Sequence, residues 1–385
     1  MKNAHGFIAT LPFLFTFTAT FWYTDATKDI VFITLASIAC YQLISYRLYS
    51  RLELHWDWIS KALVIISAYY VFSKIYHGFS SSALRVVLSI TLCSIFLPRF
   101  RFSNNMLACF VTLSAISACS YYVLLGSENI WNLNRINFAT YTAAVAVLSL
   151  FLVAQKQLYL MLIGTVSFIL VSFPFIGSSS RGPLLAFTMT IGVLILQTLF
   201  EKNRMKAVII IILSVGVLSP QILNNSFLSY KLVQANEYNG SNVDKDYNIH
   251  SRLELWKAGL SFIPSAPLLG HGYNDKTLLK ERFENYGGLD LTILYHYHNQ
   301  IISAWVRDGF IGAMIIIFLL LKPATNYLQH SLPNTDAMLL VCGIYAISGL
   351  TDTPLSNAST LSFYLYFFIL YFSIEHCNES IRLKP

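Results

Sequence analysis

The chain contains twelve stretches of mainly apolar residues, each close to the roughly 20 residues that a helix needs to cross a bilayer. They lie at about 6–23, 30–46, 58–76, 82–98, 105–125, 137–154, 157–176, 182–200, 206–222, 299–321, 337–352 and 360–376. Only 12% of the 385 residues are charged, and 55% are hydrophobic, whereas soluble domains carry about 25% charged residues. The chain is therefore expected to be an all-α, polytopic membrane protein, which excludes a cytosolic enzyme and a secreted disulfide scaffold.

The distribution of Lys and Arg predicts the orientation, because short cytoplasmic loops carry an excess of these residues. With the N-terminus inside, the short loops and adjoining helix ends hold thirteen of them on the cytoplasmic side and five on the outer side. The seven in the long segment 223–298 are left out of this count, because long loops translocate largely regardless of charge. Both termini are then expected in the cytoplasm. The long segment 223–298 lies outside, which in a bacterium is the periplasm. We divide the chain into residues 1–222 with nine spans, 223–298 as a large loop with catalytic elements, and 299–385 with three spans and a short tail.

The second half of the large loop is predicted to contain a helix. Ser251 and Glu254 have the spacing of a capping box. In this motif a serine begins the helix, and the side chain of a glutamate three residues later accepts a hydrogen bond from the backbone N–H of that serine. Leu253, Trp256 and Leu260 follow at helical spacing and predict an amphipathic helix up to about residue 263.

Prolines and glycines divide the rest of the loop. Pro264 and Pro267 are expected to end the first helix, and Gly270-His271-Gly272 to form a turn. A second amphipathic stretch runs over 276–286 and ends at Gly287-Gly288.

Two arginines are predicted at helix N-termini on the outer side. Arg181 follows a Gly-Ser-Ser-Ser run and precedes Gly182-Pro183, a pair suited to a close approach and a first helical turn. Arg252 occupies the first position of the capped loop helix. Free N–H groups and the helix dipole favour anions there, and a guanidinium matches phosphate oxygens at two points. The simpler interpretations are an interfacial or charge-paired Arg181 and a solvated Arg252.

His298 lies where the large loop re-enters the membrane. Because histidine titrates near neutrality, it can accept a proton from a sugar hydroxyl. The alternative is an anchor at the membrane interface. In an extended segment His296 would point the same way, as metal ligands do, but no acidic cluster adjoins the pair in the sequence, so we expect no metal site.

Three further polar residues are weaker candidates. Asp352, beside Thr353 and Pro354, is interpreted as a cap. Arg307 and Asp308 lie within the tenth span and are expected to pair with other groups of the bundle, although Arg307 can also add charge to an anion site.

The order of these motifs resembles the bacterial O-antigen ligase family, within the O-antigen ligase and polymerase superfamily. The resemblance rests on four features: Ser180-Arg-Gly182; Arg252-Leu-Glu-Leu-Trp256 with the Pro267…Gly270-His-Gly272 turn; the large outer loop; and His298-Asn299, nine residues, then Gly309-Phe-Ile-Gly312. Together they cover about 130 residues, and the first five spans match by topology alone.

The resemblance implies a glycosyltransferase of the bacterial inner membrane, acting in lipopolysaccharide biosynthesis. It would move O-antigen from undecaprenyl diphosphate to a lipid A–core sugar at the periplasmic face, with inversion and with no metal, cofactor or nucleotide. His298 would be catalytic, and Arg181 and Arg252 would bind the diphosphate. Ser180, Asn299 and Arg307 would support them. The expected partners are the donor, the acceptor and membrane lipids, with no nucleic acid.

Other functions use the same features. An O-antigen polymerase would take the same donor and a second lipid-linked glycan as acceptor. A protein O-oligosaccharyltransferase is expected to have an added C-terminal region, whereas this sequence ends nine residues after its last span. A lipid-glycan flippase or transporter is expected to show two related halves, whereas the polar residues here gather on one side.

Overall fold

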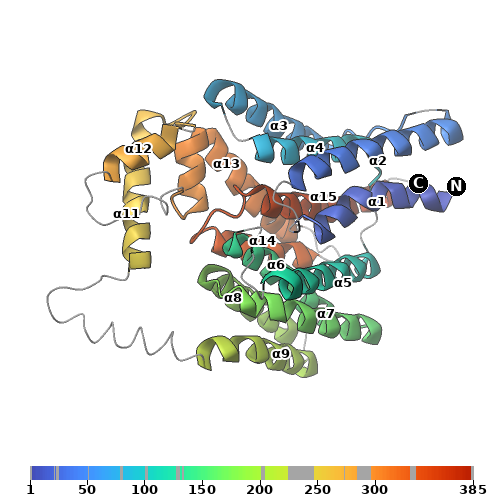
Figure 1. Ribbon diagram of the computed structural model, residues 1–385. Helices are drawn as coiled ribbons and strands as arrows, with labels where there is room; N and C mark the ends of the chain where they lie inside the picture. The colour runs from blue at the N-terminus through green and yellow to red at the C-terminus, as the bar shows by residue number, and fades with distance from the viewer. Residues whose placement is uncertain are drawn as a thin grey trace.

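The computed structural model describes residues 2–20, 22, 26–50, 52–78, 81–99, 103–126, 131, 134–200, 204–223, 247–272, 274–283, 296–329 and 335–382. The secondary structure within these ranges is helical, with no strand (Figure 1). The N-terminal helices are α1 (Lys2–Thr18), α2 (Ala26–Tyr49), α3 (Trp58–His77), α4 (Ser81–Phe96), α5 (Asn104–Tyr121) with a π-helix at Tyr122–Gly126, α6 (Arg135–Val153), α7 (Leu158–Gly177), α8 (Arg181–Phe200) and α9 (Arg204–Leu223). The C-terminal ones are α11 (Tyr247–Phe262), a 3-10 turn at Ile263–Ser265, α12 (Asn274–Phe283), α13 (Gln300–Gln329), α14 (Thr335–Ser348) and α15 (Ala358–Arg382).

Seven segments of the described chain are long and apolar enough to cross a membrane. They are Ala26–Leu48, Trp58–His77, Asn104–Gly126, Arg135–Val153, Leu158–Gly177, Arg181–Phe200 and Gln300–Asn326. Four shorter apolar helices accompany them, within α1, α4, α14 and α15. The polytopic, all-helical class is thus confirmed. Each of the twelve predicted stretches coincides with a helix, but twelve crossings remain a prediction.

Helix α6 forms the centre of the bundle. Its most apolar window is 94% buried, against 33% for α3, and it packs on α5, α7, α8, α14 and α15. The aromatic side chains of α15 are also buried, and the ring of Phe363 meets that of Phe17 edge to face at 5.0 Å. Helices that are apolar on all sides are typical of such buried positions.

Helices α11 and α12 lie at one end of the bundle, opposite the end where both chain termini lie (Figure 1). A small separate core fixes them to the start of α13, and it consists of Leu255, Ala258, Leu279, Phe283, Tyr297 and Val306. The loop helices, Tyr297 and the first turns of α13 therefore form one packed unit.

The predicted start of the loop helix is wrong. Helix α11 begins at Tyr247, so Ser251 lies inside it and is not an N-cap. Glu254 pairs with Lys257 at 2.8 Å instead of closing a capping box. Arg252 consequently lies in the second turn, and the argument from a helix N-terminus does not apply to it.

The buried face of α11 also differs from the prediction. Leu253 and Leu260 are 45% and 56% exposed, whereas Leu255 and Ala258 are buried. The reason is that α11 packs on Tyr297, which belongs to the same small core. Helical spacing alone does not indicate which side such a partner covers.

The turn and the second loop helix follow the prediction. Helix α11 ends at Phe262, before the two prolines. Gly270 and Gly272 have φ values of 74° and 58°, which favour glycine. The second helix, α12, overlaps the predicted 276–286. Gly287-Gly288 and the polar first half of the loop lie outside the described residues, apart from the start of α11.

Candidate functional site

A break in α13 receives the Gly-His-Gly turn of the loop. At Gly309 the backbone leaves the helical conformation, with φ 69° and ψ −170°. The carbonyl oxygens of Val306 and Arg307 there accept hydrogen bonds from the backbone N–H groups of His271 and Gly272, at 2.8 and 2.9 Å. The loop thus docks on the helix through main-chain hydrogen bonds.

Close packing at the same place explains why glycines recur in both motifs. The N–H of Phe310 donates to the carbonyl of Pro267 at 2.8 Å. A Cβ on Gly270 would lie 2.5 Å from the carbonyl oxygen of Arg307, and one on Gly309 would lie 2.1 Å from that of Leu268. No side chain fits between these two backbones.

Arg307 ties α12 to α13. Its guanidinium lies 3.2 Å from the carboxylate of Asp275, whose side chain is fully buried. Arg307 is therefore paired, but its partner lies in the loop helix α12 and not, as predicted, in the bundle. Its second predicted use, as charge for an anion site, is not favoured by this arrangement.

His298 stands at the junction of the loop and α13. Its φ of 49° is left-handed. The indole N–H of Trp256 on α11 donates to the carbonyl of His298 at 3.4 Å. The next residue, Asn299, caps α13, because its side-chain oxygen accepts the N–H groups of Ile301 and Ile302 at 3.0 and 3.1 Å. Asn299 thus orients the helix that follows His298.

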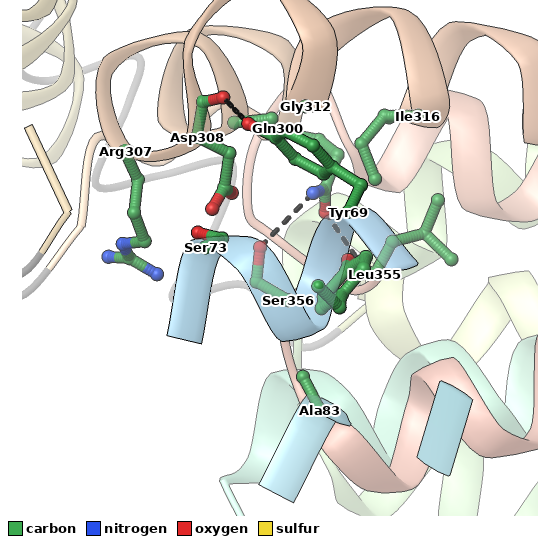
Figure 2. Close-up of a pocket in the computed structure, with 12 residues that line it drawn as sticks. Tyr69, Ser73, Ala83, Gln300, Arg307, Asp308, Gly312, Ile316, Leu355 and Ser356 are labelled. Carbon is green, nitrogen blue, oxygen red and sulfur yellow. Dashed lines mark hydrogen bonds between the residues drawn. The ribbon is translucent and has the colours of Figure 1, made fainter. Parts of the chain in front are cut away.

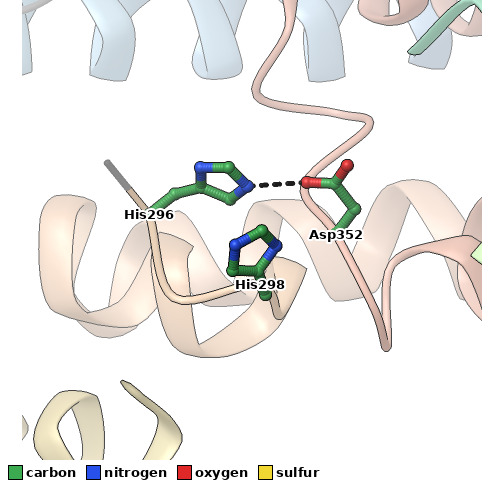
Figure 3. Close-up of side chains that lie close together, drawn as sticks. All are labelled: His296, His298 and Asp352. Carbon is green, nitrogen blue, oxygen red and sulfur yellow. Dashed lines mark hydrogen bonds and ion pairs between the residues drawn. The ribbon is translucent and has the colours of Figure 1, made fainter. Parts of the chain in front are cut away.

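Asp352 lies beside the two histidines and bonds to His296, and its interpretation as a cap is wrong. It lies in the connection between α14 and α15, and its Oδ1 accepts hydrogen bonds from Nε2 of His296 and from the N–H of Thr353, both at 2.8 Å. The rings of His296 and His298 are 4.2 Å apart (Figure 3). An acidic group therefore does lie beside the histidines, 54 positions along the chain from His298. Our reason for expecting no metal here does not hold.

The electrostatic surroundings keep His298 neutral and Asp352 ionised. Burial, His296 and the charge of Arg252 lower the pKa of His298 to about 4, while Asp352 acts in the opposite direction. Burial alone would raise the pKa of Asp352, but its hydrogen bond to His296 and the nearby charges hold that pKa below its usual value. At neutral pH the site thus contains an uncharged imidazole next to a carboxylate.

Arg252 and His298 are brought together by α11. Arg252 lies one turn before Trp256, on the same face of the helix. It is half-buried and near enough for its charge to act on His298. Packing of a continuous helix, and not a helix terminus, therefore sets the position of this arginine.

Arg181 is the first residue of α8 and is exposed. Its neighbour Gly182 lies against the loop that holds Asp352, since a Cβ there would be 2.3 Å from the hydroxyl of Thr351. The close approach predicted for Gly182 is confirmed. Ser180 turns back on the chain, with its hydroxyl 3.3 Å from the carbonyl of Ser178.

Gln300 fixes the Asp352 loop, a role that sequence reasoning missed. Its N–H donates to the carbonyl of Gly349 at 2.7 Å, its side-chain oxygen accepts the N–H of Leu355 at 2.8 Å, and its amide nitrogen lies 3.1 Å from the hydroxyl of Ser356. In the sequence, the one feature that marks Gln300 is its position two residues after His298, and this position does not reveal its partners in the Asp352 loop.

A small polar cavity lies beneath this loop, between α3 and α13 (Figure 2). Its volume is about 40 Å³, room for two or three water molecules at about 15 Å³ each. Its polar lining includes Tyr69, Ser73, Gln300, Asp308 and Ser356. Asp308 thus lines a small cavity inside the bundle.

Comparison with known proteins supports the resemblance. Residues 166–317 match the family described as O-antigen ligase. An uncharacterized protein of Haemophilus influenzae is 23% identical over 215 residues, which is 51% of this chain and 50% of that protein. The chain thus spans about half the length of this relative. The matched range holds Arg181, Arg252 and His298.

Proposed function

We propose that this chain, whose residues 166–317 form a domain of the O-antigen ligase family, transfers O-antigen from undecaprenyl diphosphate to a hydroxyl of lipid A–core. The enzyme has twelve spans and both termini in the cytoplasm of a bacterium. Its site faces the periplasm from the inner membrane, and the segment 223–298 supplies its loop elements. The observation that carries the proposal is the neutral, half-buried His298 of the matched domain, beside Arg252 and the Asp352 loop.

The arginines bind the diphosphate of the donor. Two guanidiniums favour a polyanionic leaving group, because charge-assisted hydrogen bonds to phosphate oxygens strengthen as charge develops. Two observations support this assignment: the charge of Arg252 on α11 acts on His298, and Arg181 begins α8 beside Gly182, which lies against Thr351.

An apolar groove supports a lipid donor. It has a volume of about 290 Å³ between α7 and α9 and includes Ile176, five residues before Arg181. A polyprenyl tail lying there would leave its diphosphate near the start of α8.

His298 acts as the general base. Its Nδ1 is buried with no hydrogen-bond partner among the described residues. The imidazole takes the proton of the acceptor hydroxyl as the acceptor oxygen bonds to the anomeric carbon. The bond from that carbon to the diphosphate oxygen breaks, its electron pair leaves with undecaprenyl diphosphate, and the configuration inverts. The sugar–phosphate bond supplies the free energy, so transfer needs no nucleotide, and the resemblance to the ligase family implies that it needs no metal.

The gel pattern of lipopolysaccharide tests the choice between ligase and polymerase. Cells that lack this chain are expected to make lipid A–core without O-antigen, and wild type but not His298→Ala restores the ladder. Core that carries a single repeat would instead indicate a polymerase. A protein that transfers no glycan in detergent but moves it across sealed membranes would be a transporter.

A further inference from the structure

Three groups of the kind that bind transition metals lie together at the outer end of α13. The ring nitrogens of His296 and His298 and a carboxylate oxygen of Asp352 all lie within 4.8 Å of one another. They point toward a common space (Figure 3). A tetrahedral zinc holds its ligand atoms about 3.4 Å apart, so small side-chain rotations would close the set around one ion.

The backbone arranges these groups before any ion binds. The two histidines are separated by one residue in a non-helical segment, and the left-handed φ of His298 brings its ring to 4.2 Å from that of His296. Asp352 comes from another loop, which Gln300 fastens to α13 through three hydrogen bonds. Little ordering is needed to complete the set.

The donor set suits a metal such as Zn²⁺. Zinc takes neutral imidazole and ionised carboxylate, and sites with three protein ligands leave a fourth position open for water. Two nitrogen ligands disfavour Mg²⁺ and Ca²⁺, which prefer oxygen. One nitrogen is available, because Nδ1 of His298 has no hydrogen-bond partner among the described residues.

The neighbouring charges limit the affinity. The carboxylate of Asp352 offsets part of the charge of a divalent ion, whereas Arg252 acts on His298 as a nearby positive charge. The positive charge of Arg252 repels a cation at this place and lowers its affinity. We therefore expect reversible rather than permanent binding of the ion.

We propose that His296, His298 and Asp352 form a transition-metal site that binds Zn²⁺. The bound ion coordinates the imidazole of His298, which then cannot act as the general base. The first half of this proposal stands on the geometry alone. The second half rests on the proposed function and predicts that Zn²⁺ inhibits transfer.

Equilibrium dialysis tests the site without any activity measurement. Purified full-length protein in detergent is stripped with EDTA and dialysed against ZnCl₂, and the metal per chain is counted by mass spectrometry. Wild type is expected to bind one ion that His296→Ala and Asp352→Asn bind more than about 10-fold more weakly. His271→Gln is the matched control, because the ring of His271 bonds instead to the carbonyl of Phe262 at 2.9 Å.

A spectroscopic probe and a transfer assay complete the test. Co²⁺ in place of Zn²⁺ is expected to give visible bands in wild type that Asp352→Asn abolishes, while gel filtration confirms that the variant is folded. Wild type without bound metal, or unchanged binding in both variants, would overturn the site. Zn²⁺ that binds without slowing transfer would overturn the competition. Lack of transfer by metal-free wild type, with binding intact, would instead count against the proposed function.

Discussion

The region that carries Arg252 and the region that carries Arg181 are held in place by different interactions. The loop helices α11 and α12 dock on the break of α13 through main-chain hydrogen bonds, glycine contacts and a small core. Helix α8 is held by packing against α6, α9 and α14 in the large core. A site assembled from both should be sensitive to single backbone changes on the loop side and tolerant on the bundle side.

Gly270→Val should have the largest effect. A branched side chain is strained at φ 74°, and its Cβ would lie 2.5 Å from a backbone carbonyl. The loop unit should undock, which displaces Arg252 and also disturbs His298, whose carbonyl accepts the indole N–H of Trp256 on α11. Transfer should therefore fall at least about 100-fold. Limited proteolysis should then cut within 247–283. The bundle-side control is Gly192→Ala, which meets nothing within 4 Å and should keep wild-type transfer and protection. Equal protection of the two variants would show that docking does not depend on the glycine.

Arg252→Ala and Arg181→Ala should each weaken use of the donor. Loss of charge-assisted hydrogen bonds to a diphosphate lowers kcat/KM by about 10- to 100-fold. Lysine at either position should recover part of the loss, because the charge stays while the two-point contact is lost. Steady-state kinetics with varied lipid-linked donor measures this. If alanine at either position leaves kcat/KM for the donor unchanged, that arginine is not a diphosphate ligand.

The pH profile should separate the two arginines. The charge of Arg252 lowers the pKa of His298, so Arg252→Ala should raise that pKa. Because transfer needs the neutral imidazole, the acidic limb of the profile should move to higher pH in this variant. Arg181→Ala should leave the limb in place. The measurement is made in EDTA, so that no metal occupies His298. If the acidic limb does not move in Arg252→Ala, the charge of Arg252 does not influence the pKa of His298.

Asp57→Asn should have the smallest effect, confined to the bundle. Asp57 caps α3 and pairs with Arg99 at 2.8 Å. Its loss should lower Tm by about 2 °C for a destabilisation near 1 kcal/mol, with unchanged transfer. Arg99 and the cap keep the pKa of Asp57 below its usual value despite burial. Its contribution is therefore present at neutral pH and lost as pH falls through that lowered pKa. Altered transfer in this variant would contradict the prediction, because it would show that the cap of α3 also affects the site.

The sequence predicted well what depends on local patterns. The apolar stretches coincide with helices, and the glycines at 270 and 272 mark a turn. The family resemblance came from motif order and agrees with the match over residues 166–317, whereas the roles of Arg181, Arg252 and His298 stay predictions. The start of α11 was wrong, because a capping pattern at Ser251 does not prevent a helix from beginning earlier.

Contacts between distant segments were beyond the sequence. Nothing near His296 in the chain indicates that Asp352 pairs with it, or that Gln300 holds the intervening loop. The break at Gly309 likewise has meaning only once the Gly-His-Gly turn lies against it. These contacts are set by tertiary packing. The local sequence around each residue carries no information about which distant segment will pack against it.

The most direct test of the account is glycan transfer by the purified chain in detergent, with a defined undecaprenyl diphosphate-linked donor and lipid A–core acceptor in the presence of EDTA. Wild type should transfer the glycan, and His298→Ala, equally monodisperse, should do so about 100- to 10,000-fold more slowly. Transfer by His298→Ala at the wild-type rate, or transfer only to a second lipid-linked glycan, would contradict it.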